Sequence, residues 1–144
     1  MKTSRSETAS ASEARVVGGL VRFFTGEGYR VRLEVPNMGQ SADVVASRSR
    51  WLTFVEAKRH DWRRALRQCQ AHQAVADYIC VAISLRSVSN ALLQEAKDAG
   101  YGLIRCDPAL QICEWVLQPS RNTKVWPPQR RRLMAAMKAI DYAD

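Results

Sequence analysis

Residues 78–85, YICVAISL, constrain the fold more strongly than any other stretch of this sequence. Their apolar character is continuous rather than alternating, which is typical of a strand covered by other elements on both faces. Such a strand needs helices on two sides of a sheet, so the segment predicts a layered α/β domain. A chain of 144 residues with 47% hydrophobic content is long enough to bury one sizeable core but too short for two full domains.

The segments around this strand have the alternating strand and helix patterns that such a sheet requires. The apolar spacing predicts helices over residues 13–24, 62–76 and from a cap at Ser87 or Ser89 to Lys97, with further strands at 29–35, 41–47, 51–57, 102–106 and 111–118. The order is helix, three strands, helix, strand, helix and two strands. We therefore expect an α/β fold with a mixed sheet and helices on both faces.

The composition changes twice along the chain. Residues 1–12 are rich in Ser, Thr and Ala, which predicts a flexible tail before a domain at 13–118. Residues 119–144 form a basic linker and an expected amphipathic helix over 129–140. The N-terminal stretch lacks an apolar signal core, and no segment is apolar over about 18 residues, so a cytoplasmic protein without membrane contact is expected.

The cysteines and histidines indicate no separate catalytic or metal centre. Cys69, Cys80, Cys106 and Cys113 show no CxxC spacing and lie in apolar or helical stretches, so free buried thiols are favoured over a disulfide or zinc site. His60 and His72 have no partnered nucleophile or acid at a telling spacing. His72 is expected to be a partly buried helix residue.

The charge balance points to a polyanionic partner. The formal net charge is +8 and the pI is about 9.8, which favours nucleic acid without selecting a chemistry.

Three charged residues are expected to converge at the end of the third strand. Side chains two apart on a strand point the same way, so Glu56 and Lys58 lie on one face. The preceding strand carries Asp43, and a short turn between these strands favours antiparallel pairing, which places its carboxylate beside Glu56. Two buried carboxylates repel each other unless a cation neutralises them, and hard oxygen ligands suit Mg²⁺ or Mn²⁺.

Asp43, followed on the next strand by Glu56, Ala57 and Lys58, resembles the PD-(D/E)xK nuclease superfamily. The element order over residues 13–85 is also similar to that superfamily's core. The resemblance implies a restriction-endonuclease-like three-layer αβα core (αβββαβ), with the later elements as additions. It implies metal-dependent hydrolysis of DNA phosphodiester bonds, as in Holliday-junction resolvases and repair or phage nucleases. Asp43 and Glu56 would then be metal ligands, and Lys58 the catalytic lysine that orients water.

The resemblance implies two further site residues. An acidic residue in the first helix corresponds to Glu13 as a metal ligand, and a glutamine after the lysine corresponds to Gln68, with Gln70 as the second candidate. Glu13 is equally well explained as an acid favoured by the helix dipole, and Gln68 as a solvated helix residue. Ala42 stands where the superfamily pattern has proline. A surface salt-bridge cluster is the competing explanation for the three central residues.

Two groups of arginines are expected to bind nucleic acid. Arg63, Arg64 and Arg67 follow the helix beside the expected site, where they either contact phosphates or form a solvated face. Arg130, Arg131 and Arg132 precede a stripe of Leu133, Met134, Met137 and Ile140. That helix is expected to pack on the domain or to be a contact arm, either for DNA or for dimerisation.

The sequence thus predicts a Mg²⁺-dependent DNA endonuclease acting on structured or branched DNA, either as a homodimer or within a larger DNA-processing complex. Such a small chain has little surface for reading a long base sequence, so recognition by backbone and shape is favoured. A first alternative is a catalytically idle DNA-binding or assembly subunit with the same fold. A second is a basic α/β protein that acts on RNA or binds an acidic partner.

Overall fold

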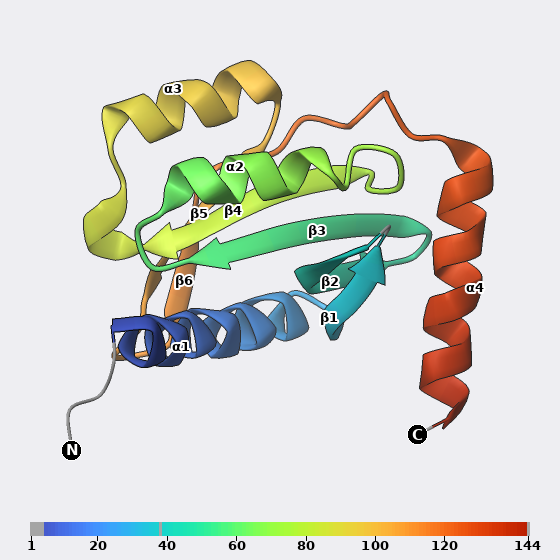
Figure 1. Ribbon diagram of the computed structural model, residues 1–144, viewed down its shortest axis with the longest axis horizontal. Helices are drawn as coiled ribbons and strands as arrows, with labels where there is room; N and C mark the ends of the chain where they lie inside the picture. Colours follow the sequence, from blue (N-terminus) through green and yellow to red (C-terminus); the bar gives the residue numbers. More distant parts are fainter. Residues whose placement is uncertain (1–4, 38, 144) are drawn as a thin grey trace.

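The computed structural model describes residues 5–37 and 39–143, with side chains over 13–37, 39–84 and 86–139. A six-stranded sheet lies between α1 on one face and α2 and α3 on the other, and α4 stands at one end of the sheet (Figure 1). The helices are α1 (Arg5–Gly26), α2 (Trp62–Gln70), α3 (Asn90–Ala99) and α4 (Pro127–Ala143), with a short 3₁₀ turn η1 (Leu85–Ser87). The strands are β1 (Arg30–Asn37), β2 (Gln40–Arg48), β3 (Trp51–Lys58), β4 (Tyr78–Ser84), β5 (Gly102–Asp107) and β6 (Ile112–Leu117).

The strands follow one another across the sheet in chain order. β1, β2 and β3 form an antiparallel meander, β3, β4 and β5 are parallel, and β6 returns antiparallel to β5. The helices α2 and α3 connect the parallel strands β3 to β4 and β4 to β5. A helix is used because a short loop cannot return the chain to the starting end of a parallel neighbour. The predicted three-layer α/β fold with a mixed sheet is confirmed.

Two hydrophobic cores fill the layers. On one face Leu20 and Phe24 of α1 pack against the sheet, and on the other Phe54 of β3 lies under α2. β4 supplies both cores, with Cys80 and Ala82 in the first and Val81 and Ile83 in the second. This division explains why residues 78–85 are apolar without alternation. Among the described helices, none is long and apolar enough to cross a membrane.

Two helices differ in extent from the sequence expectation. The first begins at Arg5, before the expected start near Ser12, so the segment expected to be a tail is helical from that point. Residues 1–4 of that expected tail lie outside the described residues. The helix α2 ends at Gln70 rather than near Ala76, because the chain tightens into turns whose amides bond carbonyls three residues back. These turns bring His72 under the sheet.

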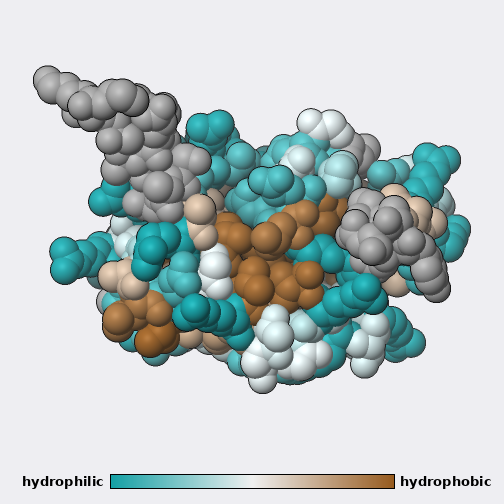
Figure 2. All heavy atoms as spheres, turned by 90° about the horizontal axis from the view of Figure 1, so that it is seen from below, coloured by the Kyte–Doolittle hydropathy of each residue, from teal (hydrophilic) through white to brown (hydrophobic). Residues whose placement is uncertain are grey.

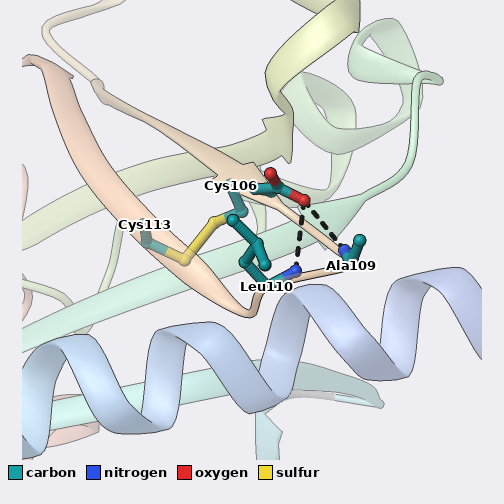
Figure 3. Close-up of a disulfide and its surroundings, with 5 residues drawn as sticks. Cys106, Ala109, Leu110 and Cys113 are labelled. Carbon is teal, nitrogen blue, oxygen red and sulfur yellow. Dashed lines mark hydrogen bonds between the residues drawn. A yellow bond between two sulfur atoms is a disulfide. The ribbon is translucent and has the colours of Figure 1, made fainter.

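The prediction of free thiols is wrong for two of the four cysteines. Cys106 and Cys113 face each other across the β5–β6 pair and form a disulfide, whereas Cys69 and Cys80 are free and buried (Figure 3). The carboxylate of Asp107 accepts hydrogen bonds from the amides of Ala109 and Leu110, which shapes the turn between the strands. The register of the β5–β6 hairpin places these two cysteines directly across from each other, and their spacing in the sequence does not predict that register.

The C-terminal helix packs on the domain. Leu133 and Met137 of α4 are 6% and 4% exposed and belong to the core on the α2 side. Its first turn is held by Arg130, whose Nη2 donates to the Asp77 carboxylate at 2.8 Å and to the carbonyl of Arg50. The apolar stripe is therefore used within the chain, which removes the basis for reading α4 as a free arm. Ile140 lies outside the described side chains.

Candidate active site

Asp43 occupies a gap between two strands. The β2–β3 ladder runs from the pair of Arg48 and Trp51 to the pair of Val44 and Val55, and the strands diverge beyond it. The Oδ2 atom of Asp43 accepts a hydrogen bond from the amide of Ala57 at 2.8 Å, so the side chain bridges the strands where the backbone ladder ends. This bond fixes one oxygen of the Asp43 carboxylate, and the second oxygen remains able to contact a neighbouring side chain.

That neighbour is Glu56. The next pair in the β2–β3 register would be Asp43 with Glu56, and the two carboxyl groups lie in hydrogen-bonding contact. Glu56 is only 1% exposed, although it is an acid at the end of a strand. The expected convergence of the two acids is therefore present in the folded chain.

A buried histidine holds Glu56 from the other side. His72 is fully buried, and its Nε2 lies 2.6 Å from Oε1 of Glu56. Its Nδ1 lies 3.0 Å from Nδ2 of Asn37, which also donates to the carbonyl of Ala71. Asn37 is itself buried at the end of β1. A chain of hydrogen bonds thus runs from β1 through the turn after α2 to the two carboxyl groups.

The hydrogen bonds also determine the tautomer of His72. Only the amide NH₂ of Asn37 can donate to the Ala71 carbonyl, so the same group donates to Nδ1 of the imidazole. The imidazole proton then lies on Nε2, from which it is donated to Glu56. Burial lowers the pKa of His72 to about 4, so the ring is neutral at physiological pH and orients Glu56 without adding a charge.

Burial raises the pKa of both acids, and Glu56 adds to the shift of Asp43, whereas hydrogen bonding with Asp43 lowers the pKa of Glu56. Burial raises the pKa of Asp43 to about 6, and the hydrogen bond to Glu56 and its charge act in the same direction. Burial also raises the pKa of Glu56 above its ordinary value. Lys58, half-buried at the end of β3, offsets part of both pKa shifts through its positive charge, which places its ammonium near both carboxylates.

Glu13 lies on the α1 side of this group. It lines a cavity of about 530 Å³ together with Val17, Leu33, Glu34 and Asp43. Figure 2 looks onto this side of the molecule, where hydrophobic side chains gather in the middle of the face and polar ones surround them. The position expected for a third acid therefore shares a cavity with Asp43.

Glu34 also lines this cavity and is exposed. Its neighbour Leu33 is 49% exposed. Glu34 has φ of +51°, in the left-handed region, and this turns the strand where the pairing with β2 skips Asp43. The same irregularity brings Glu34 to the cavity that Asp43 lines. No local sequence signal marks it.

Gln68, the glutamine implied by the resemblance, lies on α2 and is half-buried. Its backbone carbonyl accepts a hydrogen bond from Gln40, and its side-chain Oε1 is buried without a hydrogen-bond partner in the described part of the chain. An orphaned buried acceptor of this kind is unusual and suits a donor from a bound water or ligand. Gln70, the second candidate, is exposed.

The donor chemistry fits a hard divalent cation. Mg²⁺ is commonly bound through one or two carboxylates and retains several waters, and Asp43 and Glu56 supply two such groups. A cation bound by both carboxylates would offset the burial that raises their pKa values. Within the described residues, no group of three or more His, Cys, Asp or Glu side chains is arranged around one point. Waters and substrate oxygens would therefore complete the coordination.

The arginines expected to contact nucleic acid lie at two ends of the sheet. Arg63, Arg64 and Arg67 are exposed on α2, which starts just beyond Lys58. Arg130, Arg131 and Arg132 belong to α4, beside the start of β3 and so at its other end. Arg130 is engaged with Asp77, as described above. Arg131 and Arg132 are exposed.

Fold and site together define a three-layer α/β protein with a buried and a partly buried carboxylate side by side where β2 and β3 stop pairing. No protein-family model and no curated protein matches this chain. Among solved structures it is similar to SPO1766, a protein of unknown function from Silicibacter pomeroyi, with a TM-score of 0.69 and 22% identity over 91% of this chain and 88% of that one. It is also similar to an XisH family protein from Nostoc punctiforme, with a TM-score of 0.51 and 13% identity over 69% of this chain and 98% of that one. These likenesses concern the fold.

Proposed function

We propose that this chain is a Mg²⁺-dependent DNA endonuclease. The observation that carries the proposal is the contact between the Asp43 and Glu56 carboxyls beside Lys58, with the pKa of Asp43 raised to about 6. Two acids held this closely in a partly buried site destabilise the folded chain at neutral pH unless a cation joins them. Perturbed acids of this kind are concentrated at functional sites.

Each residue of the site would have a separate role in phosphodiester hydrolysis. Asp43 and Glu56 would hold the ion, with Glu56 oriented by His72 and Asp43 by the Ala57 amide. When bound, the ion supplies Lewis acidity toward a phosphate oxygen and lowers the pKa of a bound water. The Lys58 ammonium would position the attacking water. Glu13 would contribute from the α1 side and Gln68 from α2, each as a supporting group.

We favour DNA over other polyanions as the substrate because of the net charge of the chain and the arginines on its surface. The net charge of +8 and the exposed Arg63, Arg64 and Arg67 beside the site favour a phosphate backbone. A domain of this size has room to recognise the shape of branched or nicked DNA rather than a long base sequence. Two copies acting together would cut both strands.

The test compares linear, nicked, single-stranded and four-way-junction DNA, and a matching RNA, with Mg²⁺, Mn²⁺ or EDTA. We expect metal-dependent cleavage that is lost in Asp43→Ala and in Lys58→Ala and kept in Glu95→Gln, an acid exposed on α3. Cleavage of RNA alone would contradict the choice of DNA, and cleavage that survives both site variants would contradict the assigned residues.

One observation favours a second candidate, a catalytically idle subunit that binds DNA. When Asp43 is protonated, its hydrogen bond to Glu56 and the His72 hydrogen bond satisfy both acids without an ion. For this candidate, DNA binding persists with no cleavage of any substrate, and titration with Mg²⁺ or Mn²⁺ gives no heat.

A further inference from the structure

A second charged cavity lies at the other end of β3. It has a volume of about 660 Å³ and is formed by the start of β3, the segment 121–125 and the first turn of α4. The residues that matter are Arg50, Trp51, Asp77, Arg121, Arg130 and Arg131. Since Glu56 and Lys58 stand at the opposite end of the same strand, this cavity is separate from the acid pair.

The cavity holds more positive charge than its own acid can neutralise. Asp77 accepts hydrogen bonds from the Arg130 guanidinium and from the amide of Leu52, both at 2.8 Å, so its charge is matched by Arg130. For Arg50, Arg121 and Arg131, the described residues provide no carboxylate partner within ion-pair distance. Three guanidinium groups thus remain to face one solvent-filled space.

Two of these guanidinium groups lie over one aromatic ring. The guanidinium carbons of Arg50 and Arg121 lie 4.9 and 4.7 Å from the centre of the Trp51 ring. Stacking on the ring favours each cation, but two like charges on one ring repel each other. An anion bound in the cavity would offset that repulsion.

The segment that carries Arg121 is anchored in place. The side-chain amide of Asn122 donates to the carbonyls of Gln73 and Ala76 at 2.7 and 2.8 Å. The backbone N–H of Asn122 donates to the carbonyl of Asp77. Arg121 is therefore presented from a fixed backbone, which reduces the entropy lost on binding. Pro127 and Pro128 begin α4 without amide hydrogens, so recognition here depends on side chains.

We propose that this cavity binds phosphate groups of a nucleic-acid strand. Guanidinium groups match phosphate oxygens in geometry as well as charge, and the one lining acid, Asp77, is paired with a fourth arginine, Arg130. The choice of nucleic acid as the source of the phosphates rests on the proposed function. The cavity adds to it a phosphate contact remote from the acid pair, which positions the substrate without taking part in hydrolysis.

The test measures binding alone, in EDTA, by fluorescence anisotropy of a labelled DNA hairpin between 50 and 200 mM salt. The variant Arg121→Gln/Arg131→Gln removes two charges from the cavity, and Arg22→Gln/Lys97→Gln removes two exposed charges from α1 and α3. We expect the cavity variant to weaken binding about tenfold and to lower the salt slope by roughly 1.5 to 2, with the matched variant within about threefold of wild type. Trp51→Leu, which keeps the charge, should also weaken binding.

Equal losses in the two double variants would overturn the proposal, because net charge alone would then explain binding. It would also be overturned if inorganic phosphate stabilised the wild type but not the cavity variant while both bound DNA equally, which would mark a site for small anions. Melting temperatures confirm that each variant folds. The assay involves no cleavage, so its outcome is independent of whether Asp43→Ala abolishes hydrolysis.

Discussion

At the scale of single residues, the molecule contains an electrostatic conflict that its own contacts only partly resolve. Asp43 and Glu56 are drawn together by the Ala57 amide on one side and His72 on the other. Each of these donors stabilises one carboxylate, yet burial raises the pKa of both acids. The charge of Lys58 offsets only part of these shifts, which is consistent with the proposed cation, and two substitutions test this.

The first substitution removes the charge of Asp43 and keeps its shape. The folded pKa of about 6 exceeds the ordinary 3.8, so the folded chain binds the proton more tightly and loses stability as pH rises from about 4 to about 6. Asp43→Asn lacks this loss and can still accept the Ala57 hydrogen bond. We expect it to melt at a higher temperature than wild type at pH 7.5 in EDTA, with the difference shrinking toward pH 4. A difference independent of pH would contradict this account.

The second substitution removes the donor behind Glu56. His72→Leu has a comparable volume but leaves Glu56 Oε1 and the Asn37 amide without their partner, which should cost about 1–3 kcal/mol of unfolding free energy. The affinity for Mn²⁺, measured by calorimetry, should fall about 10- to 100-fold. His72→Gln, which can donate from its amide, should recover part of that affinity. Loss of stability with unchanged metal affinity would leave His72 a purely structural residue.

At the scale of elements, α2 and α4 show how the ends of helices set the two charged regions. α2 stops at Gln70, and the turns after it carry His72 to the acid pair and Asp77 to the other cavity. α4 then closes that second end by packing Leu133 and Met137 on the domain. Helix length and packing, rather than local charge, decide which arginines face which region.

The packing of α4 leads to a direct stability test. Leu133→Ala should lower the unfolding free energy by about 2–4 kcal/mol, because it leaves a cavity in the core on the α2 side. Lys138→Ala, on the exposed side of the same helix, should change it by less than about 0.5 kcal/mol. Urea denaturation measures both. Similar small effects of the two substitutions would mean that α4 is a detachable arm after all.

At the scale of the whole molecule, the acid pair and the arginine-lined cavity lie at opposite ends of β3. The acid pair stands at one end, and the cavity with Arg50, Arg121 and Arg131 stands at the other, within a chain of net charge +8. Binding and hydrolysis are thus expected to depend on different residues. In EDTA the acid pair repels phosphate, whereas the basic cavity attracts it.

This separation predicts that a variant can lose cleavage and keep binding. Asp43→Ala should bind a DNA hairpin in EDTA at least as tightly as wild type, because it removes one negative charge from the site. Adding Mg²⁺ should then strengthen binding by wild type more than by the variant. Gel-shift titrations with and without metal measure both effects. Weaker binding by Asp43→Ala in EDTA, with the fold intact, would contradict the separation.

The sequence by itself determined the layers of the fold and the approach of Asp43 to Glu56. Both follow from local patterns, since residues 78–85 are apolar on both faces and consecutive strands joined by a short turn pair antiparallel. Local signals also explain the bounds of α3, because Ser89, one of the two expected caps, caps its start and Gly100 adopts the left-handed conformation at its end.

Only the tertiary structure decided which distant residues join these elements. His72 reaches Glu56 because α2 ends early, Glu34 turns into the Asp43 cavity because β1 bends, and Cys106 meets Cys113 through the register of a hairpin. Trp51 and Arg121 come together through a linker that Asn122 anchors. The physical reason is common to all: periodicity specifies which face a residue occupies, whereas contacts between segments depend on where helices stop and strands diverge.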